Sequence, residues 1–143
     1  DLDVLLIDDA SPDKTGIMVA TEFPKVRVIY GDGTLYWAGG VRLALQQLDG
    51  KLQEYDRLLL ANDDVEFVKG ALDELVRVSR EYNAFVGGTV LTLDGKVEST
   101  GGNFGILCKP KPRLIIANGE VQKCDMLPGP LGGLQGPLIR AAV

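Results

Sequence analysis

The chain has 143 residues, a formal net charge of −5 at pH 7, an apolar fraction of 45% and no histidine. An acidic chain lacks the basic surface that sequence-independent nucleic-acid binding requires, so nucleic acid is excluded as a partner. The lack of histidine excludes Ser-His and Cys-His nucleophile pairs and His-ligated metal sites, which leaves oxygen ligands and a hard cation as the expected metal chemistry.

The apolar runs are short, far below the ~20 residues that cross a bilayer, and no signal-peptide pattern opens the chain. We therefore expect no membrane span and a cytoplasmic location. Peripheral attachment to the inner face of the membrane is compatible with this expectation. Cys108 and Cys124 match no metal or redox spacing and are predicted to be buried free thiols. Because Asp1 directly precedes a strand and Val143 lies in the start of a helical pattern, we expect a fragment that lacks the first strand and the C-terminal part of its fold.

Strand and helix patterns alternate along the first ninety residues. In chain order we predict a strand at 2–7, a helix at 15–23, a strand at 26–30, a helix at 38–49, a strand at 57–61, a helix at 70–82 and a strand at 84–93. Strands that are apolar throughout are covered on both faces, and their alternation with helices indicates right-handed βαβ crossovers. The sequence therefore predicts an α/β fold with a doubly wound, mostly parallel sheet and flanking helices.

The pattern changes after residue 90. Asp94-Gly95 predicts a hairpin turn, because this dipeptide suits backbone with positive φ. The segment 128–137 is rich in glycine and proline and is predicted to be a mobile loop.

An acidic cluster follows the first predicted strand. Asp8 and Asp9 end that strand, Ser11 lies in the turn, and Thr15 is placed to cap the next helix. The carboxyl ends of parallel strands meet along one crevice, so acidic groups there face a ligand together. Adjacent carboxylates repel each other, and a nucleobase donor, a ribose hydroxyl or a cation would relieve that repulsion. For Ser11, Asp13 and Thr15 the alternative is a role in turns and caps alone.

A second acidic cluster, Asn62-Asp63-Asp64, follows the strand at 57–61 in the matching position. Residues two apart in an extended segment share a face, so an amide oxygen at 62 and a carboxylate at 64 are expected to point the same way. That arrangement suits one divalent cation held by one or two protein oxygens. The alternative is an Asx turn or a helix cap that leads into 66–70.

A glycine-rich loop, 31–45, lies between the two clusters and opens a helix. Gly40 and its neighbouring glycines allow close backbone approach, and Trp37 is the only indole of the chain. Arg42 lies in the first turns of the helix, where it could meet a base or a phosphate. The alternative is an ordinary structural loop.

Four segments carry a family resemblance. IDDASPDKT is similar to the VDDxSxDxT segment of family-two glycosyltransferases with the GT-A fold, and GTLYWAGGVRLAL resembles their loop before the second helix. LLLANDDV resembles their metal-binding DxD-type motif in its NxD form, and AFVGGTVLTLDGKVESTGG is similar to the following stretch in bacterial rhamnosyltransferase-like members. The resemblance covers about residues 2–105.

The resemblance implies an inverting, metal-assisted glycosyltransferase of bacterial polysaccharide biosynthesis. It would transfer a hexose-type sugar from a nucleotide-diphosphate-sugar donor to a glycan or lipid-linked acceptor. Residues 1–143 would form a single GT-A-like domain, with a nucleotide-binding half at 1–90 and a partial acceptor-side half at 91–143. Asn62 and Asp64 would hold Mg²⁺ or Mn²⁺. The residues implied to bind the nucleotide sugar are Asp8, Asp9, Ser11, Trp37, Gly40, Arg42, Asn62 and Asp63.

No catalytic base is assigned, because the family places it beyond a stretch similar to CDMLPG (124–129) and no carboxylate follows Gly129 in this chain. One alternative is a GT-A-like domain that binds a nucleotide or glycan without turnover. A receiver domain would place its phosphorylated aspartate at Ala61, and a haloacid dehalogenase-type phosphatase would place its nucleophile at Tyr30. Neither residue can serve, so these two classes are disfavoured.

Overall fold

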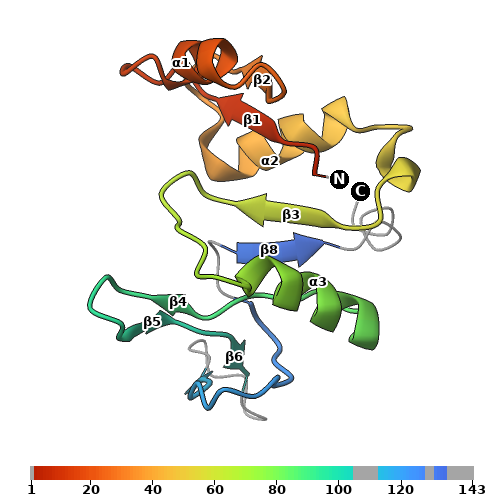
Figure 1. Ribbon diagram of the computed structural model, residues 1–143, viewed down its shortest axis with the longest axis vertical. Helices are drawn as coiled ribbons and strands as arrows, with labels where there is room; N and C mark the ends of the chain where they lie inside the picture. Colours follow the sequence, from red (N-terminus) through yellow and green to blue (C-terminus); the bar gives the residue numbers. More distant parts are fainter. Residues whose placement is uncertain (1, 105–112, 128–130, 135–143) are drawn as a thin grey trace. The chain divides into compact units, whose positions relative to one another are not determined.

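The computed structural model describes residues 2–104, 113–127 and 131–134, and the chain divides into two compact units, Asp1–Leu52 and Gln53–Val143 (Figure 1). Leu48 and Val78 are the most deeply buried apolar side chains of the described residues, one in each unit. Among the same residues, no helix combines the length and apolar character needed to cross a membrane. Cys124 is a half-buried free thiol, and Cys108 lies outside the described residues.

The first unit alternates strands and helices, as predicted. Its elements are β1 (Leu5–Asp8), α1 (Thr15–Glu22), β2 (Arg27–Tyr30) and α2 (Tyr36–Gln47). β1 and β2 pair in parallel, from Leu5 opposite Arg27 to Asp8 opposite Tyr30. α1 packs against both strands and makes the crossover between them. Because β1 and β2 end side by side, the loops that follow them, 9–14 and 31–35, leave the pair at the same edge.

The second unit contains β3 (Leu58–Ala61) and α3 (Ala71–Tyr82), close to the predicted strand and helix. A short 3₁₀ helix, η1 (Leu52–Glu54), precedes β3. α3 is amphipathic, with Asp73 and Glu74 in its first turn and Arg80 in its last, a distribution that suits the helix dipole. Its inner face buries Val78 and Ser79.

β3 pairs antiparallel with β8 (Leu131–Leu134). This pairing corrects the prediction of a mobile loop at 128–137, of which the structure describes 131–134 as a strand. Glycine has a low strand propensity because it contributes no side chain to packing, but its backbone N–H and C=O groups pair like any others. Composition alone therefore missed β8.

The predicted hairpin at Asp94-Gly95 is confirmed. β4 (Val90–Leu91) pairs with β5 (Val97–Ser99), and Gly95 at the turn has φ +80°. The strand predicted at 84–93 is much shorter than expected, since only 90–91 belong to β4. A further antiparallel pair joins β6 (Gly102–Asn103) to β7 (Arg113–Leu114).

The described strands form four separate pairs, of which only β1 and β2 are parallel. The doubly wound, mostly parallel sheet is therefore not seen in the part of the chain that the structure describes. The apolar character of a strand reports how well its two faces are covered and does not specify whether its hydrogen-bonded neighbour, such as β8 beside β3, runs parallel or antiparallel.

Candidate functional site

Asp8 ends β1 and caps α1 from outside the helix. Its Oδ2 accepts a hydrogen bond of 2.9 Å from the backbone N–H of Gly16, and its Oδ1 accepts one of 2.8 Å from the N–H of Ser11. The N-cap residue Lys14 offers no side-chain cap, so Asp8 takes over that task for the first turn of α1. Asp8 is 6% exposed. The Ser11 hydroxyl and the N–H groups of Ser11 and Gly16 lower the pKa of its carboxyl.

Asp9 does the same for α2, on the other side of the strand end. Its Oδ1 accepts 2.7 Å from the N–H of Gly33, and its Oδ2 accepts 2.8 Å from Leu35 and 3.2 Å from Tyr36. α2 begins at Tyr36 and has no side-chain cap of its own. The two adjacent carboxylates thus face different loops, and backbone N–H groups supply the positive partners that were expected to come from a ligand.

Two glycines make room for these carboxylates. A Cβ at Gly16 would lie 2.2 Å from Oδ2 of Asp8, and one at Gly31 would lie 2.4 Å from Oδ1 of Asp9. Gly40 is different, because its Cβ would lie 3.7 Å from Cγ2 of Ile7, an ordinary packing distance. Gly40 therefore faces β1 in the first unit.

Gly16→Ala and Gly40→Ala are a matched pair, since both glycines lie in helices and helix propensity favours alanine by about 1 kcal/mol. We expect Gly40→Ala to leave the midpoint of urea unfolding unchanged or raise it. Gly16→Ala should lower it clearly, because Asp8 is held by two N–H groups and cannot yield to the new methyl. Equal effects of the two substitutions would contradict the capping role of Asp8.

Each of the two loops also leads into an Asp-x-Thr turn, in which the aspartate carboxylate accepts two hydrogen bonds from the threonine. Asp13 Oδ1 accepts from the N–H and the hydroxyl of Thr15, at 3.0 and 2.6 Å. Asp32 Oδ1 accepts from the N–H and the hydroxyl of Thr34 at the same distances. Thr15 is therefore the first residue of α1 and a turn donor, not the cap that the sequence predicted. Asp32 was missed, although the repeated spacing of Asp13-Lys14-Thr15 and Asp32-Gly33-Thr34 was a signal for it.

The start of α2 presents aromatic rings and a cation. Tyr36 is 84% exposed and Trp37 is 55% exposed. Tyr36 has φ 50°, which a bulky residue rarely adopts, and Asp9 holds its N–H. Arg42 is exposed in the second turn of the helix. Flat apolar surfaces and a guanidinium at a helix N-terminus can contact a base and a phosphate.

Asn62, Asp63 and Asp64 follow β3 directly in the second unit, where Asp63 and Asp64 form a turn. The turn corrects the expectation that 62 and 64 share one face of an extended segment. The alternative of a helix cap is also wrong, since α3 begins at Ala71 with Gly70 as its N-cap. Asp63 and Asp64 are exposed and Asn62 is half-buried.

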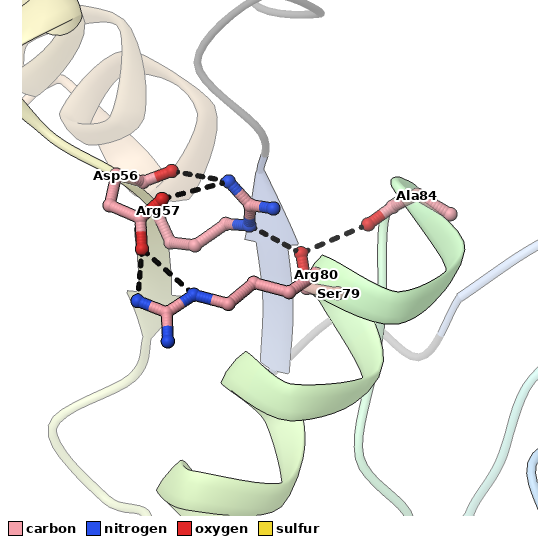
Figure 2. Close-up of polar contacts among 5 residues, drawn as sticks. All are labelled: Asp56, Arg57, Ser79, Arg80 and Ala84. Carbon is pink, nitrogen blue, oxygen red and sulfur yellow. Dashed lines mark hydrogen bonds and ion pairs between the residues drawn. The ribbon is translucent and has the colours of Figure 1, made fainter.

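A polar network fixes the strand that carries this turn. Figure 2 shows Arg57, at the entrance to β3, in contact with Asp56 and with Ser79 of α3. Arg80 Nε donates to Asp56 Oδ2 at 2.9 Å, and Ser79 Oγ donates to the carbonyl of Ala84 at 3.2 Å. The sequence reasoning missed this network, because no local spacing links 56–57 to 79–84.

The donor set at 62–64 fits a hard divalent cation, since it consists of one amide and two carboxylate groups. Among the described residues, no group of three or more acidic or thiol side chains is gathered as a complete metal cage. One or two protein oxygens suffice for Mg²⁺, which commonly takes its other ligands from phosphates and water. The residues present therefore fit a cation that is shared with a phosphorylated ligand.

The sequence-predicted residues fall into two groups. The first unit holds Asp8, Asp9, Ser11, Trp37, Gly40 and Arg42. The second holds Asn62, Asp63 and Asp64. In both groups the aspartates lie at or just after the carboxyl end of a strand, whereas Arg42 lies within α2.

Residues 1–120 match a family described as glycosyl transferase family 2. The chain belongs to glycosyl transferase family 2. No curated protein and no solved structure matches it. The family implies the GT-A fold of nucleotide-sugar transferases, with a nucleotide-sugar donor and an acceptor as substrates. This family-two domain thus has a glycosyltransferase-type function, and the resemblance to rhamnosyltransferase-like members stays a prediction.

Proposed function

We propose that this family-two domain transfers a hexose-type sugar from a nucleotide-diphosphate donor to a hydroxyl group of a glycan or lipid-linked acceptor, with inversion at the anomeric carbon. The observation that supports the proposal most strongly is the pair of capped loops at one edge of β1 and β2. Asp8 and Asp9 hold five backbone N–H groups there. Loops fixed in this way offer a ready-made surface to a ligand that binds beyond the strand ends.

The donor's nucleotide is assigned to the first unit. A carboxylate has about four acceptor positions, so Asp9, which accepts three N–H groups, retains one for a base or ribose donor. Asp8 and Ser11 keep the neighbouring loop in place. Trp37 offers a surface for stacking beside Gly40, and Arg42 offers a cation to the diphosphate.

The diphosphate and its cation are assigned to the turn after β3. Asp64 and Asn62 would hold Mg²⁺ or Mn²⁺, with Asp63 alongside. When bound, such a cation offsets the negative charge that builds on the leaving diphosphate. The exposure of Asp63 and Asp64 leaves their carboxylates free to turn toward a ligand without a burial cost.

The proposal predicts that uridine, guanosine or thymidine diphosphate raises the melting temperature only when Mn²⁺ is present. A ligand at 100 times its Kd stabilises the folded state by about 2.7 kcal/mol. For a chain of this length that corresponds to a rise of roughly 5–10 °C. The matched control is each nucleotide with excess chelator, and the absence of a rise with any of the three would contradict the proposal.

Turnover is tested on the same protein by release of nucleoside diphosphate from the matching nucleotide sugar on addition of acceptor. Acceptor-dependent release supports transfer. Metal-dependent binding without release would instead support the alternative of a binding domain without catalysis.

A further inference from the structure

We propose that Arg57 is a positioning residue that sets where the Asn62-Asp63-Asp64 turn lies. It ties the entrance of β3 to the last turns of α3, and the turn follows directly from the other end of the same strand. The inference rests on the proposed role of this turn in donor binding.

Arg57 joins three segments of the second unit (Figure 2). Its Nε donates to Oγ of Ser79 at 3.0 Å, and its Nη1 donates to the carbonyl of Asp56 at 2.6 Å. Ser79 in turn donates to the carbonyl of Ala84, in the segment that follows α3. The helix, the strand entrance and the chain beyond the helix therefore share one chain of hydrogen bonds.

Burial separates the inner part of the network from its outer part. Ser79 is 5% exposed and the side chain of Arg57 is 20% exposed, whereas Asp56 and Arg80 are exposed. Exposed ion pairs such as Asp56–Arg80 contribute little because water and salt screen them. A half-buried guanidinium that loses its partner is costly, so the hydrogen bond from Arg57 to Ser79 is the stronger constraint.

The constraint reaches the turn because β3 is short and paired. Only Leu58–Ala61 separate Arg57 from Asn62, a span of about 17 Å for five steps of 3.3 Å. Pairing with β8 keeps that segment extended. In a strand, a slip of one residue moves every side chain to the opposite face, so fixing Arg57 against α3 fixes the direction in which the turn leaves β3.

Arg77 provides the matched control. It is also an arginine of this unit with ionic partners, but both partners, Glu74 and Glu81, belong to its own helix. Its removal deletes ion pairs within α3 and leaves the link between α3 and β3 intact.

The test compares Arg57→Ala, Arg57→Lys, Ser79→Ala and Arg77→Ala in two measurements. Amide chemical shifts of 62–64 report the position of the turn without any ligand, and the Kd of the nucleoside diphosphate with Mn²⁺ reports its function. We expect Arg57→Ala to shift these amides and to raise the Kd about tenfold or more, since small misplacements of a binding group are costly. Arg57→Lys should recover part of the loss, because one ammonium can reach Ser79 or the Asp56 carbonyl but lacks the fork that bonds both.

Ser79→Ala should shift the same amides, and Arg77→Ala should change neither measurement. If Arg57→Ala fails to fold, the lysine and Ser79 variants decide the question. Wild-type amide shifts at 62–64 in the folded Arg57 and Ser79 variants would overturn the proposal. Shifted amides in a protein that binds no nucleotide would instead refute the proposed function and leave the positioning role standing.

Discussion

Asp8→Asn is expected to lower the free energy of unfolding by about 1–3 kcal/mol, a substantial share of the 5–15 kcal/mol typical of a domain. Asparagine has nearly the same shape, but its side chain has one oxygen for two N–H groups. Its NH₂ group would have to face the N–H of Ser11, which is part-buried, or that of Gly16, which is buried, so one of these donors loses its acceptor. Urea unfolding at pH 7 measures the difference.

The lowered pKa of Asp8 predicts how the free energy of unfolding depends on pH. The pKa of Asp8 is lowered in the folded protein, so its contribution is fully present above the ordinary aspartate pKa of about 3.9. It is lost as the pH falls through the lowered value. Stability of the wild type should therefore decline more steeply below pH 4 than that of Asp8→Asn, and the two should converge in acid.

Asp49→Asn is the control for Asp8→Asn, because Asp49 is an exposed aspartate that follows α2. It should match the wild type at pH 7. A loss of stability of equal size in the two variants would show that the carboxylate of Asp8 does not hold the N–H groups of Ser11 and Gly16 as described. The same conclusion would follow if the decline of stability below pH 4 were unchanged by Asp8→Asn.

Asp64→Ala is expected to remove the metal-dependent part of nucleotide binding while the free protein keeps its melting temperature. The side chain is exposed in the turn after β3, so its loss creates neither a cavity nor a buried unpaired group. Without Asp64, one of the two proposed protein ligands remains. It is the amide oxygen of Asn62, which binds a cation more weakly than a carboxylate does. The rise of roughly 5–10 °C expected with nucleoside diphosphate and Mn²⁺ should largely disappear.

Glu66→Ala controls for the loss of a carboxylate two residues further along, since Glu66 is exposed as well. It should retain the full metal-dependent rise. If Asp64→Ala keeps that rise, the residue belongs to a turn and not to a cation site.

Local sequence patterns predicted the first unit well. The alternation of apolar runs with helical periodicity located β1, α1, β2 and α2 within a few residues, and Asp94-Gly95 located the hairpin, because these signals arise from neighbours in the chain. β8 was missed because a strand containing two glycines has little side-chain pattern to detect. Its pairing with β3 depends on residues at least seventy positions away.

The sequence predicted which residues belong to the candidate site more readily than it predicted which contacts those residues make. That Asp8 and Asp9 matter follows from their place at a strand end. The capping of two helices by these carboxylates does not follow from the local sequence, because Asp9 meets N–H groups 24 to 27 residues away. Arg57 and Ser79 meet in the same way across 22 residues, with no motif in the sequence to connect them. Long-range hydrogen bonds of this kind become visible only when the fold brings the partners together.

The central claim is that the Asn62-Asp63-Asp64 turn holds the divalent cation of a nucleotide-diphosphate donor. The most direct measurement is the line broadening that Mn²⁺ causes in the amide resonances of the nucleoside diphosphate complex, which falls steeply with distance from the ion. We predict that the amides of Asn62–Asp64 broaden only when nucleotide is present, and that Asp64→Ala removes this broadening. Broadening that needs no nucleotide, or that persists in Asp64→Ala, would contradict a cation site that binds the diphosphate of the donor.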